Sequence, residues 1–143
     1  GHLVFRERAS GLAYAGDLVA GEGTILIDPA DAGDMAAYLA SLERIAAIAP
    51  RALIPAHGPV ITAPEALLRR YIDHRRMRED KILAAVGDQT IDLPALLARV
   101  YDDTPRALWP LAERSLEAHL GKLVAEGRLH RDGSAIRRGG GAG

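Results

Sequence analysis

The sequence predicts an α/β fold followed by a smaller α+β module, and three observations lead to this class. Two short apolar runs each end in one side chain that is able to bind a metal: residues 12–15 lead to Asp17, and residues 53–56 lead to His57. A stretch with helical periodicity lies between them at residues 34–49. C-terminal to these runs, residues 93–138 carry the sequence signals of helices followed by a β-hairpin.

The composition is that of one ordinary domain or two small ones without a strong overall charge. The chain has 143 residues, of which 48% are hydrophobic and 26% charged, and a formal net charge of −1. It contains no apolar run near the roughly 18 residues of a membrane span and opens with no secretory leader. With no cysteine, any metal must be held by histidine and carboxylate, and a cytoplasmic location is expected.

The first part of the chain is predicted to alternate short strands with one helix. Residues 3–5 and 12–15 are apolar runs joined by a polar stretch, which predicts a β-hairpin, and residues 24–27 are a further β-prone run. Residues 34–49 read as an amphipathic helix that Pro50 ends. The expected buried stripe of that helix consists of Met35, Tyr38, Leu39, Leu42, Ile45 and Ala46. A short buried strand then presents His57 at its C-terminal edge, where sites of layered α/β proteins gather.

A long helix is predicted to follow, with a start signal at residues 62–65 and Gly87 at its end. Its ends are apolar and its middle, residues 73–81, is nearly all polar. We expect the middle of such a helix to be exposed to solvent and its two ends to be buried in two separately packed parts of the protein. His74, Arg75 and Arg78 are expected to form an interdomain hydrogen-bond set, with anion binding as the alternative. The basic face expected to be solvated consists of Arg69, Arg70, Arg75, Arg76 and Arg78.

The last part of the chain has the outline of a winged helix. Residues 93–101 predict a short helix, and Thr104-Pro105 starts another that runs to Glu126. The expected buried stripe of this second helix consists of Leu116, Leu120, Leu123 and Val124. The pair Asp132-Gly133 suits a type I′ turn and predicts a hairpin around it. Residues 139–143 are expected to be a disordered tail.

Several different short motifs, each weak alone, follow one another in a specific order and spacing along nearly the whole chain. They are Ala15-Gly16-Asp17, Gly21-Glu22-Gly23-Thr24, Gly33-Asp34-Met35, Tyr38-Leu39, Ser41-Leu42, Pro55-Ala56-His57-Gly58-Pro59, Tyr71-Ile72, His74-Arg75, Arg78-Glu79 and Ile82-Leu83. With them the chain resembles the C-terminal half of a metallo-β-lactamase-superfamily hydrolase with an appended winged-helix domain. The resemblance implies the C-terminal half of an αβ/βα sandwich at residues 1–62, a bridging helix at 63–87 and a winged helix at 88–138.

The same resemblance implies a dinuclear metal site, usually with two zinc ions. Asp17 matches the aspartate that bridges both metals, and His57 matches the last histidine ligand of the second, so both are expected to serve metal binding and catalysis. A metal-bound hydroxide would attack an ester, thioester, lactam or phosphodiester. The family's H-x-H-x-D-H and T-P-G-H segments are absent. The chain is therefore expected to be a fragment that is inactive alone.

Each candidate residue also has a purely structural interpretation. An aspartate after a strand is most often a cap or turn residue, and a lone histidine is often a core residue bonded to backbone. For Asp17 and His57 the matching motifs favour the ligand role. His2 is expected to be structural or a cloning remnant, whereas Glu22 either contacts substrate or serves a turn. The two histidines expected at the surface are His119 and His130.

Two functions remain open at this point. The first is an enzyme whose partners are a small-molecule or single-stranded RNA substrate and the missing N-terminal half of the same sandwich. The alternative is a winged-helix module for nucleic-acid binding or protein interaction. The helix expected at residues 105–127 carries 3 basic and 3 acidic side chains, whereas phosphate binding needs uncompensated cations. Sequence-specific DNA binding and membrane binding are therefore not expected.

Overall fold

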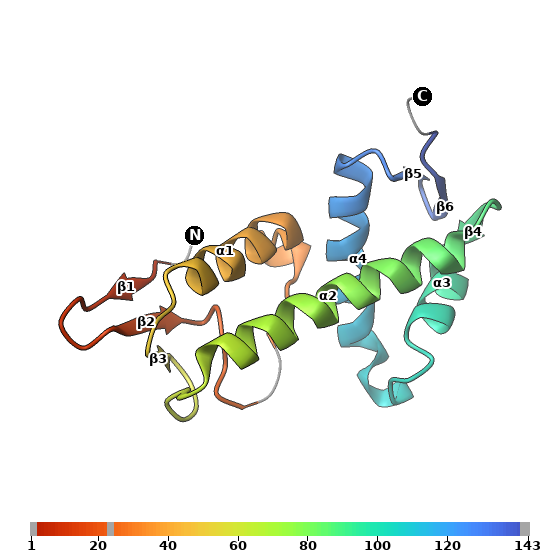
Figure 1. Ribbon diagram of the computed structural model, residues 1–143. Coiled ribbons are helices and arrows are strands. Elements are labelled where there is room, and N and C mark those ends of the chain that lie inside the picture. Colours follow the sequence, from red (N-terminus) through yellow and green to blue (C-terminus); the bar gives the residue numbers. More distant parts are fainter. Residues whose placement is uncertain (1–2, 23–24, 141–143) are drawn as a thin grey trace. The chain divides into compact units, whose positions relative to one another are not determined.

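The computed structural model describes residues 3–22 and 25–140, which fall into two compact units (Figure 1). The first unit contains the described residues up to Ile25 together with Ala36–His74, and the second contains Leu26–Met35 and the residues from Arg75 on. His2 and Thr24 lie outside the described residues. No helix in the described part of the chain has the length and apolar character to cross a membrane.

The first unit is built on a three-stranded sheet with the order β1-β2-β3. Strand β1 (Phe5–Arg6) pairs antiparallel with β2 (Leu12–Gly16), which confirms the predicted hairpin, and β2 pairs in parallel with β3 (Ala52–Pro55). Because β2 and β3 are parallel, their C-terminal ends lie at the same edge of the sheet. Helix α1 (Met35–Ala47) lies between these strands in the sequence, as predicted.

The two faces of this sheet differ sharply in exposure. Ala13, Ala15 and Leu53 are completely buried on one face. On the other, Phe5 pairs with Tyr14 and Tyr14 pairs with Ile54 in the strand register, so these three side chains form one apolar row across the sheet. Phe5 is 65% exposed and Tyr14 is 50% exposed. An exposed apolar row of this kind is typical of a surface that another segment covers.

Two predictions for this region were wrong in part. The run predicted to be β-prone at residues 24–27 forms no strand over its described residues 25–27, and the Asp28 side chain then accepts a hydrogen bond from Ala30 N at 3.0 Å and starts a short 3₁₀ helix, η1 (Pro29–Asp31). Pro29 lacks the N–H that a further ladder bond would need. In α1 the predicted stripe is buried except for Ala46, which is exposed.

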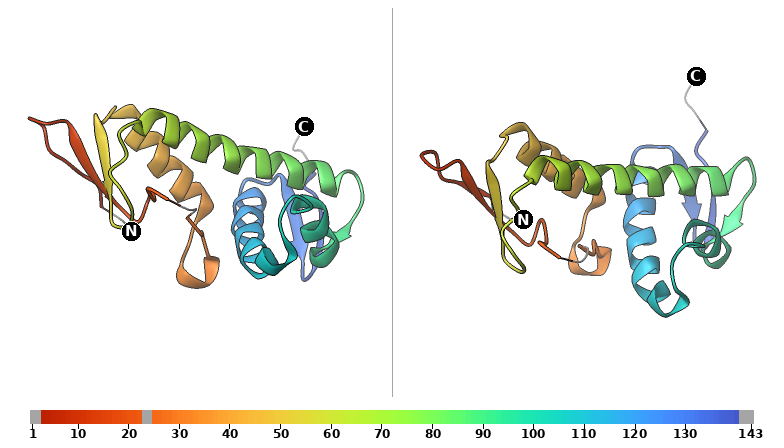
Figure 2. Two further views of the ribbon diagram at one scale, coloured as in Figure 1. Left: turned by 90° about the horizontal axis from the view of Figure 1, so that it is seen from below. Right: turned by 60° about the horizontal axis from the view of Figure 1, so that its bottom comes forward.

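The second unit has the helices and hairpin of a winged helix (Figure 2). Helix α3 (Leu93–Val100) begins at Asp92, whose carboxylate accepts from Ala95 N at 2.8 Å, and helix α4 (Trp109–Ala125) follows the 3₁₀ helix η2 (Arg106–Leu108). Its sheet has the order β4-β6-β5, from β4 (Ile91–Asp92), β6 (Ala135–Arg138) and β5 (Leu129–Asp132). The short strand β4 was not predicted.

The core of the second unit includes the C-terminal end of helix α2 (Pro64–Val86). Ile82 from α2, Leu96 from α3, Leu116 and Leu120 from α4, and Ile136 from β6 are all fully buried. Val124 was predicted to belong to the buried stripe of α4 but is 36% exposed, so the prediction was wrong for this residue.

The hairpin turn differs from the predicted type. Asp132 pairs with Ala135 as the last residue of β5, so the central residues of the turn are Gly133 and Ser134. Gly133 has a φ of 57°, whereas Ser134 is not among the residues with positive φ. A positive φ at the first central position alone defines a type II′ turn, which glycine adopts without strain. At the end of β6, Gly139 donates its N–H to Arg128 O at 2.9 Å.

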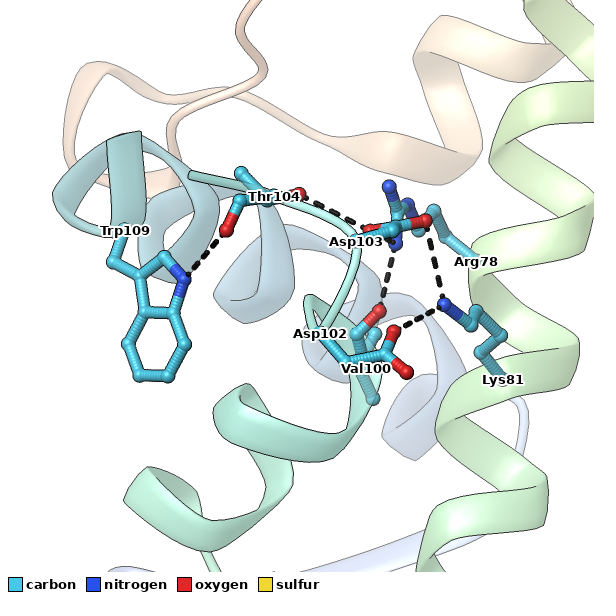
Figure 3. A network of polar contacts seen from close by, with 7 residues as sticks. All are labelled: Arg78, Lys81, Val100, Asp102, Asp103, Thr104 and Trp109. Atoms are coloured by element: carbon cyan, nitrogen blue, oxygen red, sulfur yellow. Dashed lines mark hydrogen bonds and ion pairs between the residues drawn. The ribbon is translucent and has the colours of Figure 1, made fainter. Parts of the chain in front are cut away.

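The middle of α2 is buried along one face, so the prediction that it is solvated was wrong in part. Arg75, Arg78 and Glu79 are each less than 10% exposed. Figure 3 shows Arg78 directed at the loop that follows α3, where its guanidinium donates to Val100 O at 2.7 Å and to Asp103 at 2.9 Å. Lys81 on the same helix donates to Asp102 at 2.8 Å. The Arg78 guanidinium can be buried because a carbonyl and a carboxylate of the second unit accept its Nη1 hydrogens.

His119 was also predicted wrongly, because it is completely buried in α4 rather than at the surface. Its Nδ1 lies 3.3 Å from Glu79 Oε1, and Lys122 donates to the other oxygen of the same carboxylate at 2.8 Å. His130 is exposed on β5, as predicted.

Candidate functional site

Asp17 stands directly after strand β2, where the chain leaves the sheet. The register between β2 and β3 shifts between Tyr14 and Gly16, which marks an irregularity just before the aspartate. Gly16 O then accepts the N–H of Ala56 at 2.9 Å. The backbone before Asp17 is therefore fixed to the backbone before His57.

His57 stands two residues after the end of β3. The chain turns back behind it, since Leu53 and Ile61 exchange backbone hydrogen bonds in both directions at 3.0 and 2.9 Å. The imidazole consequently lies at the same sheet edge as Asp17. His57 Nε2 is 3.6 Å from Asp17 Oδ1, and the two side chains are 86% and 57% exposed.

Close packing of two glycines joins the loops that carry these side chains. A Cβ atom on Gly21 would lie 2.5 Å from Pro59 O, which is closer than real Cβ contacts allow. Gly58 has a φ of 88° and lies against the backbone of Gly21. In addition, Gly21 N donates to His57 O at 3.4 Å. Only glycine fits at both positions, so the two loops are held together by their backbones.

Two tyrosines on helices donate hydrogen bonds to the loop that follows Asp17. Tyr38 in α1 donates its hydroxyl to Leu18 O at 3.2 Å, and Tyr71 in α2 donates to Ala20 O at 3.3 Å. Leu18 and Ala20 follow Asp17 by one and three residues. The apolar periodicity predicts Tyr38 in a buried stripe and assigns no role to its hydroxyl. Its position among otherwise aliphatic residues was the available signal, because a buried tyrosine hydroxyl normally has a hydrogen-bond partner.

The Asp17–His57 pair fits part of a metal coordination shell. A zinc ion bound to both donors at about 2.0–2.1 Å with a tetrahedral angle would hold them about 3.4 Å apart. The observed separation is 3.6 Å. Within residues 3–22 and 25–140 no group of three or more metal-binding side chains is present. Glu22 is exposed in the loop after Asp17 and adds no third ligand to the pair.

Comparisons with known proteins concern the winged helix and the fold of the chain. Residues 93–139 match the family described as β-lactamase associated winged helix domain. The chain is 36% identical to a β-lactamase-like protein 2 homolog of Drosophila melanogaster and 30% identical to one of Caenorhabditis elegans, over 87% and 80% of this chain. These alignments cover 42% and 37% of the relatives, so the chain spans less than half of their length.

Two solved structures share its fold over 96% of the chain. A metallo-β-lactamase family protein from Thermus thermophilus matches with a TM-score of 0.77 and 22% identity, and a β-lactamase domain protein from Burkholderia ambifaria matches with 0.81 and 21%. This chain covers 45% and 44% of those chains. The α/β unit and the winged helix are thus the fold of part of such proteins.

Proposed function

We propose that the complete protein is a dinuclear zinc-dependent hydrolase. In support, the chain matches a β-lactamase-associated winged helix and shares the fold of metallo-β-lactamase family proteins. The observation that carries the proposal is the pair of exposed donors at one sheet edge, His57 Nε2 and Asp17 Oδ1, 3.6 Å apart. An imidazole nitrogen and a carboxylate oxygen are donors that zinc accepts.

Each of the two residues would have a distinct part in holding the metals. Asp17 would be shared by the two ions, and His57 would help to hold the second ion. Bound zinc would supply Lewis-acid activation of an acyl or phosphoryl centre and of the attacking water. The exposure of both side chains leaves room on their open side for further ligands and for substrate.

The chain alone is proposed to be inactive, because a catalytic zinc site needs about three protein ligands. The remaining ligands and the other wall of the substrate pocket would come from the missing N-terminal half of the same sandwich. Two observations support that partner. The relatives are more than twice as long as their aligned part, and the sheet leaves the apolar row of Phe5, Tyr14 and Ile54 on its outer face.

The substrate is proposed to be a small-molecule ester, thioester or lactam, or single-stranded RNA. The winged helix would serve as a packing domain rather than as a reader of duplex DNA. In support, three cations of this unit already have acidic partners: Arg114 pairs with Asp28, Lys122 with Glu79, and Arg131 with Glu117. The proposal includes a cytoplasmic location, with which the cysteine-free composition is compatible.

The test compares metal content and hydrolysis between this chain and a longer form that restores the H-x-H-x-D-H and T-P-G-H segments. After dialysis, the longer form should retain about two zinc ions and hydrolyse ester, thioester, lactam or phosphodiester probes. This chain should retain less than one zinc and hydrolyse none of them. A longer form without zinc, or one whose zinc content and activity survive Asp17→Ala, would contradict the proposal.

A further inference from the structure

The loop between Asp17 and Gly21 carries one candidate ligand and touches the loop of the other. Its first residue is Asp17, and its last residue, Gly21, donates to His57 O at 3.4 Å. The described structure thus joins the two candidate ligands through the four peptide units of this loop and the bond from Gly21 N to His57 O, in addition to the bond from Ala56 N to Gly16 O. The loop therefore contacts the backbone of both candidate ligands at its two ends.

Two hydroxyls from different helices bind alternate carbonyls of this loop. Tyr38 in α1 donates to Leu18 O at 3.2 Å, and the Tyr38 side chain is only 5% exposed. Tyr71 in α2 donates to Ala20 O at 3.3 Å and is partly buried. Both acceptors are main-chain atoms, so the loop is held at these points whatever its side chains are.

Backbone and apolar contacts also hold the loop among the described residues. Inside it, Leu18 N donates to Ala15 O at 3.2 Å, which closes the turn after β2. Leu18 and Val19 bury their side chains, whereas the Asp17 side chain is largely exposed. The hydroxyl bonds act on the residues between Asp17 and the Gly21 contact, where a small shift is transmitted to both ends.

We propose that Tyr38 and Tyr71 are positioning residues that act through this loop and set the geometry of the Asp17–His57 pair. Neither tyrosine is assigned to touch metal or substrate. The inference rests on the proposed function in one respect, namely that the Asp17–His57 pair binds metal. Its structural part, the holding of the loop, stands apart from metal chemistry and can be measured without it.

The test uses Tyr38→Phe and Tyr71→Phe in this chain, because phenylalanine keeps the ring and removes only the hydroxyl. Tyr14→Phe is the matched control, since Tyr14 lies in the same unit and is 50% exposed. Amide hydrogen exchange is followed by NMR at Leu18 N and Gly21 N, both of which donate within the site. The amides of strand β2 report on the stability of the whole unit.

Each of the two variants should raise exchange at Leu18 N and Gly21 N about three- to fivefold, as expected for the loss of one hydrogen bond. Exchange in β2 should change less, and Tyr14→Phe should change neither. If all amides of the unit speed up together, the tyrosines stabilise the fold without positioning the loop, and the proposal is wrong. If the loop amides are unchanged, it is wrong as well.

A second measurement separates this proposal from the proposed function. In the longer form, zinc affinity is measured by competition with a chelator for the wild type and the same three variants. Tyr38→Phe and Tyr71→Phe should weaken zinc binding about three- to fivefold, and Tyr14→Phe should not. Zinc binding that is absent from the wild type overturns the function, whereas zinc binding that is unaffected by loss of either hydroxyl overturns the positioning role.

Discussion

His119 Nδ1 lies 3.3 Å from Glu79 Oε1, and the two side chains are only 0% and 6% exposed. Burial lowers the pKa of His119 below its ordinary value, more strongly than the hydrogen bond to Glu79 raises it. Burial raises the pKa of Glu79, but hydrogen bonds from His119 and Lys122 outweigh it, so that this pKa is lowered overall. At neutral pH the pair is therefore a neutral imidazole that donates to a carboxylate.

This pair predicts a loss of stability on mild acidification. The unfolded chain protonates His119 near pH 6.5, whereas the folded chain resists protonation until a lower pH. The free energy of unfolding should therefore fall below pH 6.5, by up to about 1.4 kcal/mol per pH unit. Arg75 and Lys122 add to the effect, because both cations disfavour the imidazolium. Urea unfolding at pH 7.5, 6.5 and 5.5 measures it.

His119→Gln should remove this pH dependence and lower the stability at pH 7.5 by about 1–3 kcal/mol through the weakened bond to Glu79. His130→Gln is the control, because His130 is exposed on β5. In the control, the free energy of unfolding should depend on pH as it does in the wild type. An unchanged slope in His119→Gln would show that His119 is not the group that titrates.

Asp103 predicts a second, more acidic transition. The hydrogen bond from Arg78, with further attraction by Lys81, lowers the pKa of Asp103 to about 2. A lowered carboxyl pKa stabilises the fold above its ordinary value near 4, and the contribution is lost as the pH falls from about 4 to about 2. The side chain is 48% exposed, so solvent screening reduces the contribution at pH 7 to about 1 kcal/mol.

The measurement compares Asp103→Asn with Asp88→Asn by urea unfolding at pH 7 and by acid titration of the circular dichroism signal. Asp103→Asn should lose about 1 kcal/mol at pH 7 and show a flatter acid limb. Asp88 is exposed, and its replacement should have little effect. Equal behaviour of the two variants would show that the Arg78 contact does not stabilise the second unit.

Leu120 is the residue on which the predicted winged-helix core is best tested. It is completely buried in α4 and belongs to the core that α2, α3, α4 and β6 share. Leu120→Ala should lower the free energy of unfolding by about 2–5 kcal/mol, because it removes buried methyl groups and leaves a cavity. Leu111→Ala in the same helix, where the side chain is 49% exposed, should change it by about 0.5 kcal/mol or less.

Local patterns predicted most of the elements, whereas long-range polar contacts were not predictable from them. The hairpin β1-β2, helix α1 and strand β3 follow from apolar periodicity and turn residues, which act over a few positions. The same patterns predicted that Asp17 and His57 lie at one edge of the sheet, because each follows a buried strand. It did not identify which atom accepts the Tyr38 hydroxyl, since the sequence pattern does not point to a backbone carbonyl 20 residues away.

The buried charges of α2 show the same limit. A run of polar residues in a helix reads as solvated unless its partners are known. The partners of Arg78 are Val100 O and Asp103, more than 20 residues further along the chain. His119 was assigned to the surface for the same reason, since its partner Glu79 is 40 residues away. Periodicity predicts burial of apolar side chains but does not predict which charges are paired.

Duplex DNA should bind this chain only weakly and without sequence preference. Arg114, Lys122 and Arg131 are engaged by Asp28, Glu79 and Glu117, which weakens their attraction to phosphate and reduces counterion release. The dissociation constant at about 150 mM salt should be weaker than roughly 1 µM. A fluorescence anisotropy titration with several unrelated duplexes measures this. Sequence-selective binding in the nanomolar range would favour the interaction module over the hydrolase.

Zinc binding gives the sharpest test of the Asp17–His57 pair in this chain and in its longer form. In this chain the two donors leave most of the coordination shell to water, so zinc should bind more weakly than about 1 µM and be lost on dialysis. Asp17→Ala and His57→Ala should weaken even this binding. His130→Ala is the matched control, because its imidazole is exposed on β5 in the other unit.

In the longer form the two variants should differ. Asp17→Ala should lose more zinc and more activity than His57→Ala, because a bridging carboxylate contacts both ions whereas a terminal histidine contacts one. Metal analysis of dialysed samples and hydrolysis assays on the same preparations show which variant loses more zinc and more activity. Tight, stoichiometric zinc in this chain alone would mean that other residues complete the shell, such as Glu22 or His2. An equal loss in the two variants would remove the bridging role from Asp17.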